Sequence, residues 1–154
     1  MRWSLGGILA DLDAHKYLWS IKGHNGSKPC TTCQNVVGFV TDDVLAHRND
    51  LVSMSCVDPQ RIIYNTDASV YAIVDRLRAA KASGMSQAAF DRLEQVHGVV
   101  YDESTLLFDD ELRHIVKPVT HCIRDHMHCL VSNGSVGTEI VLLLQELTDC
   151  NVTP

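Results

Sequence analysis

The feature of this sequence that most constrains its fold is a run of helix signals between residues 66 and 98. Thr66 or Asp67 can cap the start of a helix, because a short polar side chain accepts hydrogen bonds from the free backbone N–H groups there. Lys81 suits a helix end and Gly84 is a natural stop. Between cap and stop, apolar residues recur at helical spacing and form one stripe: Val70, Ile73, Val74 and Leu77.

A second helix is expected directly after the first. Ser86 can cap its start, and Gly98 can end it. The apolar residues between these two positions are Ala89, Phe90, Leu93 and Val96. Two amphipathic helices joined by a short connection predict a helical hairpin, which we interpret as an inserted or accessory element.

The segments before the hairpin are predicted to be mostly extended or irregular. Apolar and polar residues alternate over 8–13, and residues 17–21 are rich in strand formers, so we expect one or two strands within 5–21. A short strand is expected over 35–40. Residues 41–60 read as a loop with a short helical turn.

The segments after the hairpin are predicted to alternate between helix and strand. A short helix capped by Asp109 is expected over 109–116, followed by a strand over 119–124. A last helix is expected from Met127 onward, regular over 138–147. The predicted fold class is therefore α/β (α+β).

The composition fits a globular chain. It has 154 residues, of which 45% are hydrophobic and 21% charged, so it can bury a core. No run of 18 apolar residues predicts a transmembrane helix. The apolar run over 5–10 is too short for a signal peptide. We expect an intracellular protein that does not associate with membranes.

The charge of the chain argues against one class of function. Lys and Arg number 13 against 19 Asp and Glu, for a net charge of −6, and the excess of acid lies after residue 100. A free-standing DNA-binding module is usually basic, because it neutralises phosphates. Strong autonomous binding of nucleic acid is therefore not expected.

Cys30 and Cys33 form a C-x-x-C pair, and two thiolates at this spacing can occupy adjacent corners of a tetrahedral zinc site. A structural Zn²⁺ needs four ligands. The leading candidates for the other two are His24 and Cys56, with His47 a further one. Two alternatives stay open: a redox dithiol and a pair without metal. Because a chain of this size needs no disulfide framework, we expect a reducing compartment.

A second group of candidate ligands lies within residues 121–129, which hold three histidines, two cysteines and Asp125. An aspartate where a strand meets a helix is a common Mg²⁺ ligand. One alternative is a partly buried polar segment with two core cysteines. Another is a metal hydrolase site, for which the candidates are His121, Asp125, His126 and His128.

Two sequence blocks resemble those of one family. Residues 125–130, Asp-His-Met-His-Cys-Leu, resemble the D-x-M-H-C-L stretch of CACTA-type DDE DNA transposases and related transposon-like proteins. Residues 19–23, Trp-Ser-Ile-Lys-Gly, are similar to that family's W-S-x-K-G segment. Residues 28–33, which contain the cysteine pair, are similar to its C-x-x-C knuckle. The blocks occur in the family's order and frame most of the chain.

The resemblance implies an RNase H-like fold and a DDE set of catalytic acids. Asp125 would be the second metal-binding aspartate of that set. His128 would be the histidine after it, which orients the metal site or the DNA. Cys30 and Cys33 would form the zinc knuckle. The catalytic ions would be Mg²⁺ or Mn²⁺, which the three acids hold for DNA strand cleavage and transfer.

The other two acids of the set are not assigned by the resemblance. The first belongs on the first strand, which we expect before Met1. Asp11 and Asp13 are alternatives to it, although the simpler interpretation makes them solvent-facing carboxylates. The third should lie farther downstream than Glu139 and Glu146, which read as polar residues of the last helix. Because one acid cannot hold two ions, the chain alone is expected to be inactive.

These expectations describe one partial domain over residues 1–154, a partial RNase H-like core with two insertions. Its segments are core strands (1–23), a zinc-knuckle insertion (24–60), a helical insertion (61–117), and a core strand and helix (118–154). The expected function is a fragment or domesticated remnant of a DDE transposase, nuclear, acting on DNA through its parent protein. The alternative is a non-enzymatic, zinc-stabilised interaction domain with a protein partner.

Overall fold

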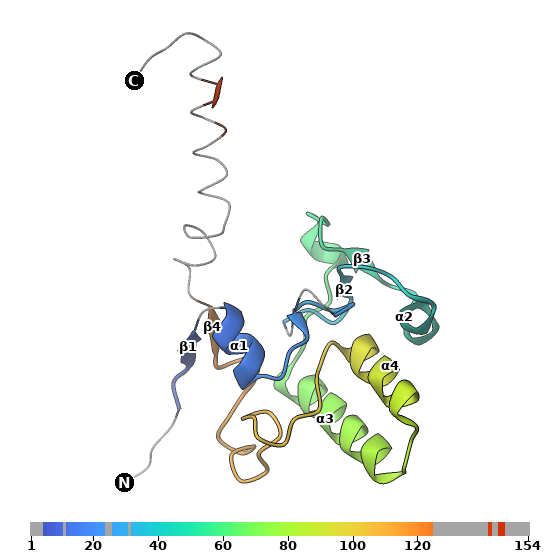
Figure 1. Cartoon of the computed structure of the whole chain (residues 1–154). Helices are drawn as coiled ribbons and strands as arrows, with labels where there is room; N and C mark the ends of the chain where they lie inside the picture. Colours follow the sequence, from blue (N-terminus) through green and yellow to red (C-terminus); the bar gives the residue numbers. More distant parts are fainter. Residues whose placement is uncertain are drawn as a thin grey trace.

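The computed structural model describes residues 5–10, 12–23, 26–30, 32–124, 142, 145 and 146. These residues form helices and small sheets, which confirms the α/β class at a coarse level. Figure 1 shows β1, β4 and α1 together, the α3–α4 hairpin, and α2 with β2 and β3. The elements in chain order are β1 (Ile8–Ala10), α1 (Leu12–Leu18), β2 (Val36–Val37), α2 (Asp42–His47), β3 (Val52–Ser53), η2 (Pro59–Arg61), α3 (Asp67–Ala82), α4 (Gln87–His97) and β4 (Cys122–Arg124).

The predicted helical hairpin is confirmed as α3 and α4. Thr66 and Ser69 cap α3 reciprocally, each side chain accepting a hydrogen bond from the other residue's backbone N–H. Ser86 occupies the cap position of α4 without a side-chain hydrogen bond, and Gly98 ends α4 in the left-handed conformation. The largest buried core lies between this hairpin and the chain that follows it: Val70, Tyr71, Val74, Leu77, Ala80, Phe90, Val99, Leu107 and Phe108.

The prediction of extended structure across 5–21 is wrong after Ala10, because the next described residues form α1. A helix brings His15 and Trp19, four positions apart, onto one face. There the indole Nε1 of Trp19 donates a hydrogen bond of 2.9 Å to Nδ1 of His15. Both side chains are buried, so this pair and its packing favour the helix over the alternation that the sequence shows.

The predicted short helix that begins at Asp109 is also wrong, since consecutive turns take its place. Asp109 does act as a cap, because its carboxylate accepts two backbone N–H bonds. The chain is then held against α3 instead of continuing as a helix. Arg113 binds the Asp75 carboxylate through two hydrogen bonds, and the Tyr71 hydroxyl donates to the Val116 carbonyl at 2.8 Å.

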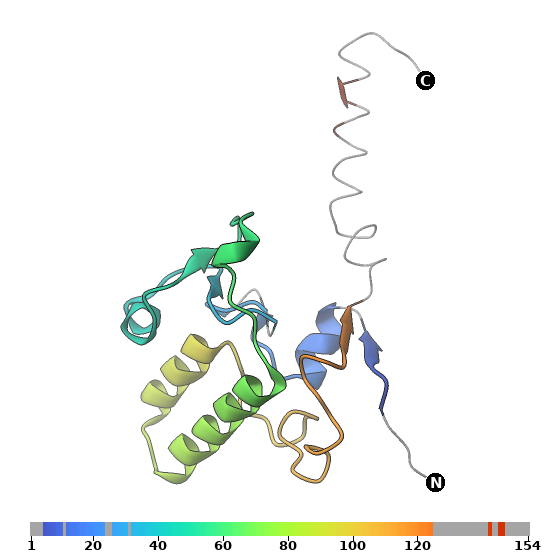
Figure 2. The ribbon, with the colours of Figure 1, turned by 180° about the vertical axis from the view of Figure 1, so that it is seen from behind.

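Two parallel strand pairs form the sheets. β1 pairs with β4 so that Ile8 lies opposite Cys122 and Ala10 opposite Arg124, which confirms the end of the predicted strand over 119–124. Figure 2 shows this pair from behind, with α1 beside it. β2 pairs with β3, also in parallel. The short helical turn predicted within residues 41–60 is found as α2, whereas β3 lies where a loop was expected.

Some predictions fall on residues that the structure does not describe. The helix expected from Met127 is described only at Leu142, Gln145 and Glu146, which are helical. Within the described ranges, no helix combines the length and the apolarity that crossing a membrane requires.

Candidate functional site

The β1–β4 pair leads to the acids that the sequence singled out. Ala10 is the partner of Arg124 across the two parallel strands, and the next residues in the chain are Asp11 and Asp125. These two aspartates, like His128, lie outside the described residues. The structure therefore describes the strands that precede the candidate acids, not the acids themselves.

His15 fastens this strand pair to α1. Its Nδ1 accepts from Trp19, whose indole N–H can only donate, so the ring proton is on Nε2. That Nε2 donates to the carbonyl of Ile123 in β4, at 2.9 Å. The Cys122 thiol also lies 3.7 Å from Nδ1. A neutral, buried imidazole thus fixes the end of β4 relative to the helix that follows β1.

The Trp-Ser-Ile-Lys-Gly block joins α1 to the chain after α4. Trp19 is fully buried in the core. Ser20 adopts a positive φ of 50°, and its carbonyl accepts from the N–H of Val100 at 2.7 Å. The Lys22 ammonium lies 3.2 Å from the carboxylate of Glu94 on α4. The described contacts of this block are therefore structural.

Gly98 positions the chain that enters the cysteine loop. Its φ is +70°, and a Cβ added there would lie 2.4 Å from the carbonyl oxygen of Lys28. Lys22, which precedes Lys28 by six residues, donates its backbone N–H to the carbonyl of Gly98 at 2.9 Å. Only glycine allows this close approach of the two backbones. The C-terminus of α4 therefore fixes where Lys28 lies.

The cysteine pair lies in a tight loop. The N–H of Thr32 donates a hydrogen bond to Sγ of Cys30 at 3.3 Å. Cys33 forms an antiparallel bridge with Tyr64, next to the start of α3. No helix begins at either cysteine within the described residues, unlike in a redox C-x-x-C motif.

Asn35 organises the segment after the cysteines, and sequence reasoning did not single it out. Its amide donates to the carbonyls of Asp50 and Arg61, both at 2.8 Å. Its carbonyl oxygen accepts from the N–H of Ile63 at 2.8 Å. A buried Asn that satisfies three distant backbone groups holds the ends of this segment together. An Asn at the start of a predicted short strand carries no sequence signal for such a role.

The described residues fit a zinc site only in part. Among them, no three His, Cys, Asp or Glu side chains gather closely enough to hold a metal ion. Cys56 therefore does not complete a site with Cys30 and Cys33, and its thiol instead lies 3.7 Å from the carbonyl of Asp58. His24 lies outside the described residues. Zinc binding by Cys30 and Cys33 therefore stays a prediction, as do the other two ligands.

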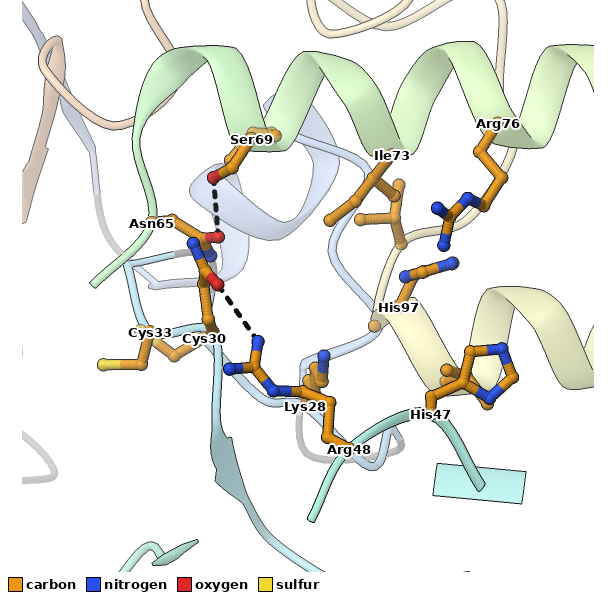
Figure 3. Close-up of a pocket in the computed structure, with 15 residues that line it drawn as sticks. Lys28, Cys30, Cys33, His47, Arg48, Asn65, Ser69, Ile73, Arg76 and His97 are labelled. Atoms are coloured by element: carbon orange, nitrogen blue, oxygen red, sulfur yellow. Dashed lines mark hydrogen bonds between the residues drawn. The ribbon is translucent and has the colours of Figure 1, made fainter. Parts of the chain in front are cut away.

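A cavity of about 230 Å³ opens beside the cysteine pair. Figure 3 shows the two cysteines on one side of it and Arg76, His97 and His47 on the other. Its walls come from the cysteine loop, α2, α3 and the end of α4. The described polar and charged side chains that line it are Lys28, Cys30, Cys33, Gln34, His47, Arg48, Asn65, Ser69, Arg76 and His97.

The electrostatics of this cavity are positive. Burial, and then the charge of Arg48, lower the pKa of Lys28, while Asp50 acts in the opposite direction. Arg48 donates to both carboxylate oxygens of Asp50, at 2.7 and 2.6 Å, and to the amide oxygen of Gln34. Apart from Arg48, the cations that line the cavity make no ion pair among the described residues.

The positive charges around this cavity, together with burial, change the pKa of His97. Burial, followed by the positive charges of Lys28, Arg76 and His47, lowers the pKa of His97 from 6.5 to about 4. Its Nε2 is buried without a hydrogen-bond partner among the described residues. A buried imidazole with an unsatisfied nitrogen marks a place where a ligand or a water can bind.

Sequence reasoning missed this cavity, because its lining residues lie between positions 28 and 99 in four separate segments. His121 was a candidate ligand, and its Nδ1 instead accepts a hydrogen bond from the backbone N–H of Lys117 at 3.2 Å.

No protein-family model, curated protein or solved structure significantly matches this chain.

Proposed function

We propose that this chain is part of a DDE-type DNA transposase core, a fragment or domesticated remnant, in which Asp11 and Asp125 form the carboxylate pair for Mg²⁺ or Mn²⁺. The observation that carries the proposal is the register of β1 and β4. Ala10 lies opposite Arg124, and in the sequence an aspartate directly follows each of these two residues. In sheets of parallel strands, ligands bind outside the carboxyl ends of the strands.

The spacing of parallel strands supports the pair. Neighbouring strands lie about 4.8 Å apart, so carboxylates at matching positions can share one divalent cation. A cation held there would act as a Lewis acid on a phosphodiester. The neutral His15 bridge to Ile123 would hold the two strand ends in place while they bind the ion. With no third acid assigned, the chain alone is proposed to be inactive.

The register favours Asp11 over Asp13 as the first acid. Asp13 is exposed and lies in the first turn of α1, where a carboxylate stabilises the helix dipole. Asp11 follows the last paired residue of β1 directly. The proposal thus takes β1 as the strand of the first acid, in place of a strand before Met1.

Binding of Mn²⁺ to the whole chain tests this proposal without requiring activity. Electron paramagnetic resonance measures the free ion as protein is added. Asp11→Asn and Asp125→Asn should each weaken Mn²⁺ binding at least tenfold, whereas Asp13→Asn should change it less than twofold. If all three variants bind Mn²⁺ as the native chain does, the carboxylate pair does not exist.

A zinc-stabilised interaction domain is the second candidate, and one observation favours it. The segment between the cysteine pair and α3 exposes large apolar side chains, including Val57 at 95%. Exposed apolar residues that gather on one module are typical of a protein-binding surface. The others on this segment are Phe39, Val40, Leu45, Met54, Ile63 and Tyr64. Retention of a partner by a chain with Asp11→Asn and Asp125→Asn would favour this candidate.

A further inference from the structure

The cavity beside the cysteine pair has a composition that the proposed function does not use. Three of its described lining side chains are cationic, namely Lys28, Arg48 and Arg76, and none is a carboxylate. The whole chain is acidic, with a net charge of −6. A concave site that gathers cations in an acidic protein selects for an anion, because field lines concentrate in a cavity of one sign.

The cations are placed to share one ligand. In Figure 3 the Lys28 ammonium points into the open space, which Arg48 borders on one side and Arg76 on the other. Arg48 is already held by Asp50, so its orientation is fixed before a ligand arrives. The buried Nε2 of His97, which has no described partner, faces the charges of Lys28 and Arg76. A ligand with several acceptor oxygens would satisfy these donors together.

The size and the walls of the cavity narrow the ligand class. About 230 Å³ corresponds to roughly eight waters at ~30 Å³ each. That volume suits a phosphate group with a small organic body. Apolar side chains complete the wall, so part of the ligand can be uncharged: Val70, Ile73, Val96 and Val99. Asn65 and Ser69 at the start of α3 add polar groups.

We propose that this cavity binds the terminal phosphate of a small phosphate monoester. A monoester carries a charge between about −1.5 and −2 at pH 7 and three acceptor oxygens. That charge matches a cluster of cations better than a backbone phosphodiester, which carries one charge and is blocked on two sides. The site lies on the hairpin and the cysteine loop, so it does not depend on the carboxylate pair.

Calorimetric titration of the whole chain tests the proposal with inorganic phosphate and with a nucleoside monophosphate as probes. Both should bind with a stoichiometry of one. Arg76→Gln should weaken binding at least tenfold, because Arg76 is an exposed residue whose loss leaves the core intact. Lys28→Gln should do the same. The matched control is Arg92→Gln on the exposed face of α4, which should change affinity less than twofold.

A second experiment locates the bound ligand, independently of its affinity. Phosphate should shift the ring resonances of His97 in a nuclear magnetic resonance spectrum and leave those of exposed His114 in place. Absence of saturable binding by either probe would overturn the proposal, as would an equal loss in Arg76→Gln and Arg92→Gln. If a duplex oligonucleotide binds saturably and neither phosphate probe does, the proposal is also overturned, since the site would then bind a nucleic-acid backbone.

Discussion

The indole Nε1 of Trp19 donates a hydrogen bond of 2.9 Å to Nδ1 of His15 inside the core between α1 and the β1–β4 pair. Because Nδ1 is the acceptor, Nε2 carries the proton that binds the Ile123 carbonyl. One side chain of the Trp-Ser-Ile-Lys-Gly block therefore sets the tautomer of a histidine that fastens β4. The block and the strand that leads to Asp125 are physically linked.

Replacing Trp19 by Phe tests this link. The variant removes the indole donor to the buried Nδ1 of His15, which keeps only the weak contact with the Cys122 thiol at 3.7 Å, and it opens a void where the indole ring was larger. The free energy of unfolding should fall by about 2–4 kcal/mol. Urea denaturation measures the loss. Tyr17→Phe, at an exposed position of the same helix, should change stability by less than about 0.5 kcal/mol. Equal stability of the two variants would refute the link.

Gly98→Ala should destabilise the chain by about 2–4 kcal/mol, since it adds a backbone clash to an unfavourable φ. Gly84→Ala is the matched control. Gly84 has nearly the same φ, +72°, but nothing lies within 4 Å of the added Cβ, so only the conformational cost of about 1 kcal/mol applies. Thermal unfolding compares them. If Gly98→Ala and Gly84→Ala lower the stability equally, the backbone of Lys28 does not approach Gly98 as closely as described.

Stability should depend on pH through His97. Its pKa is about 4 in the folded chain, lowered from 6.5 by burial and then by Lys28, Arg76 and His47. The unfolded chain therefore takes up this proton at a higher pH than the folded chain does. The stabilisation is complete above about pH 6.5 and is lost as pH falls towards 4, on the order of 3 kcal/mol in total. The other titratable or charged side chains lining the same cavity are Cys30, Cys33 and Arg48.

Urea denaturation at pH 7 and at pH 4.5 measures this dependence. His97→Gln should reduce the difference in stability between the two conditions, because glutamine does not titrate. His114→Gln changes an exposed histidine and should leave the difference unaltered. If both variants show the same difference in stability between pH 7 and pH 4.5 as the native chain, other groups cause the acid sensitivity.

Elemental analysis tests the zinc prediction. Protein purified without chelator should contain one Zn²⁺ per chain, and Cys30→Ser or Cys33→Ser should lose it. Cys56→Ser should keep it, because the described residues do not bring Cys56 to the pair. Absence of zinc from the native chain would eliminate the knuckle. Loss of zinc in Cys56→Ser would restore Cys56 as a ligand.

The part of the fold that the sequence predicts well is the part whose signals are local. The cap at Thr66, the stripe from Val70 to Leu77 and the left-handed Gly98 are each encoded within a few residues. Helix α1 was missed because its determinants are tertiary. Seven residues hold too short a pattern to identify a helix, and the bond from Trp19 to His15 matters only once both are buried.

The candidate sites also differ in whether their residues are close together in the sequence. The Cys30–Cys33 pair can be read from spacing alone. The cavity cannot, because Lys28, Arg76 and His97 are distant in sequence and converge only through the packing of α4 against the cysteine loop. The pairing of Ala10 with Arg124 is likewise non-local, and it is what favours Asp11 over Asp13.

The proposed function requires that the ends of β1 and β4 lead to one metal site. Paramagnetic broadening of amide signals by Mn²⁺ tests it most directly, since the effect falls steeply with distance from the ion. At substoichiometric Mn²⁺, the amides of Ala10 and Arg124 should broaden first, and those of α4 should stay sharp. Asp125→Asn should abolish this pattern. Broadening that spares both strand ends, or that persists unchanged in Asp125→Asn, would contradict the account.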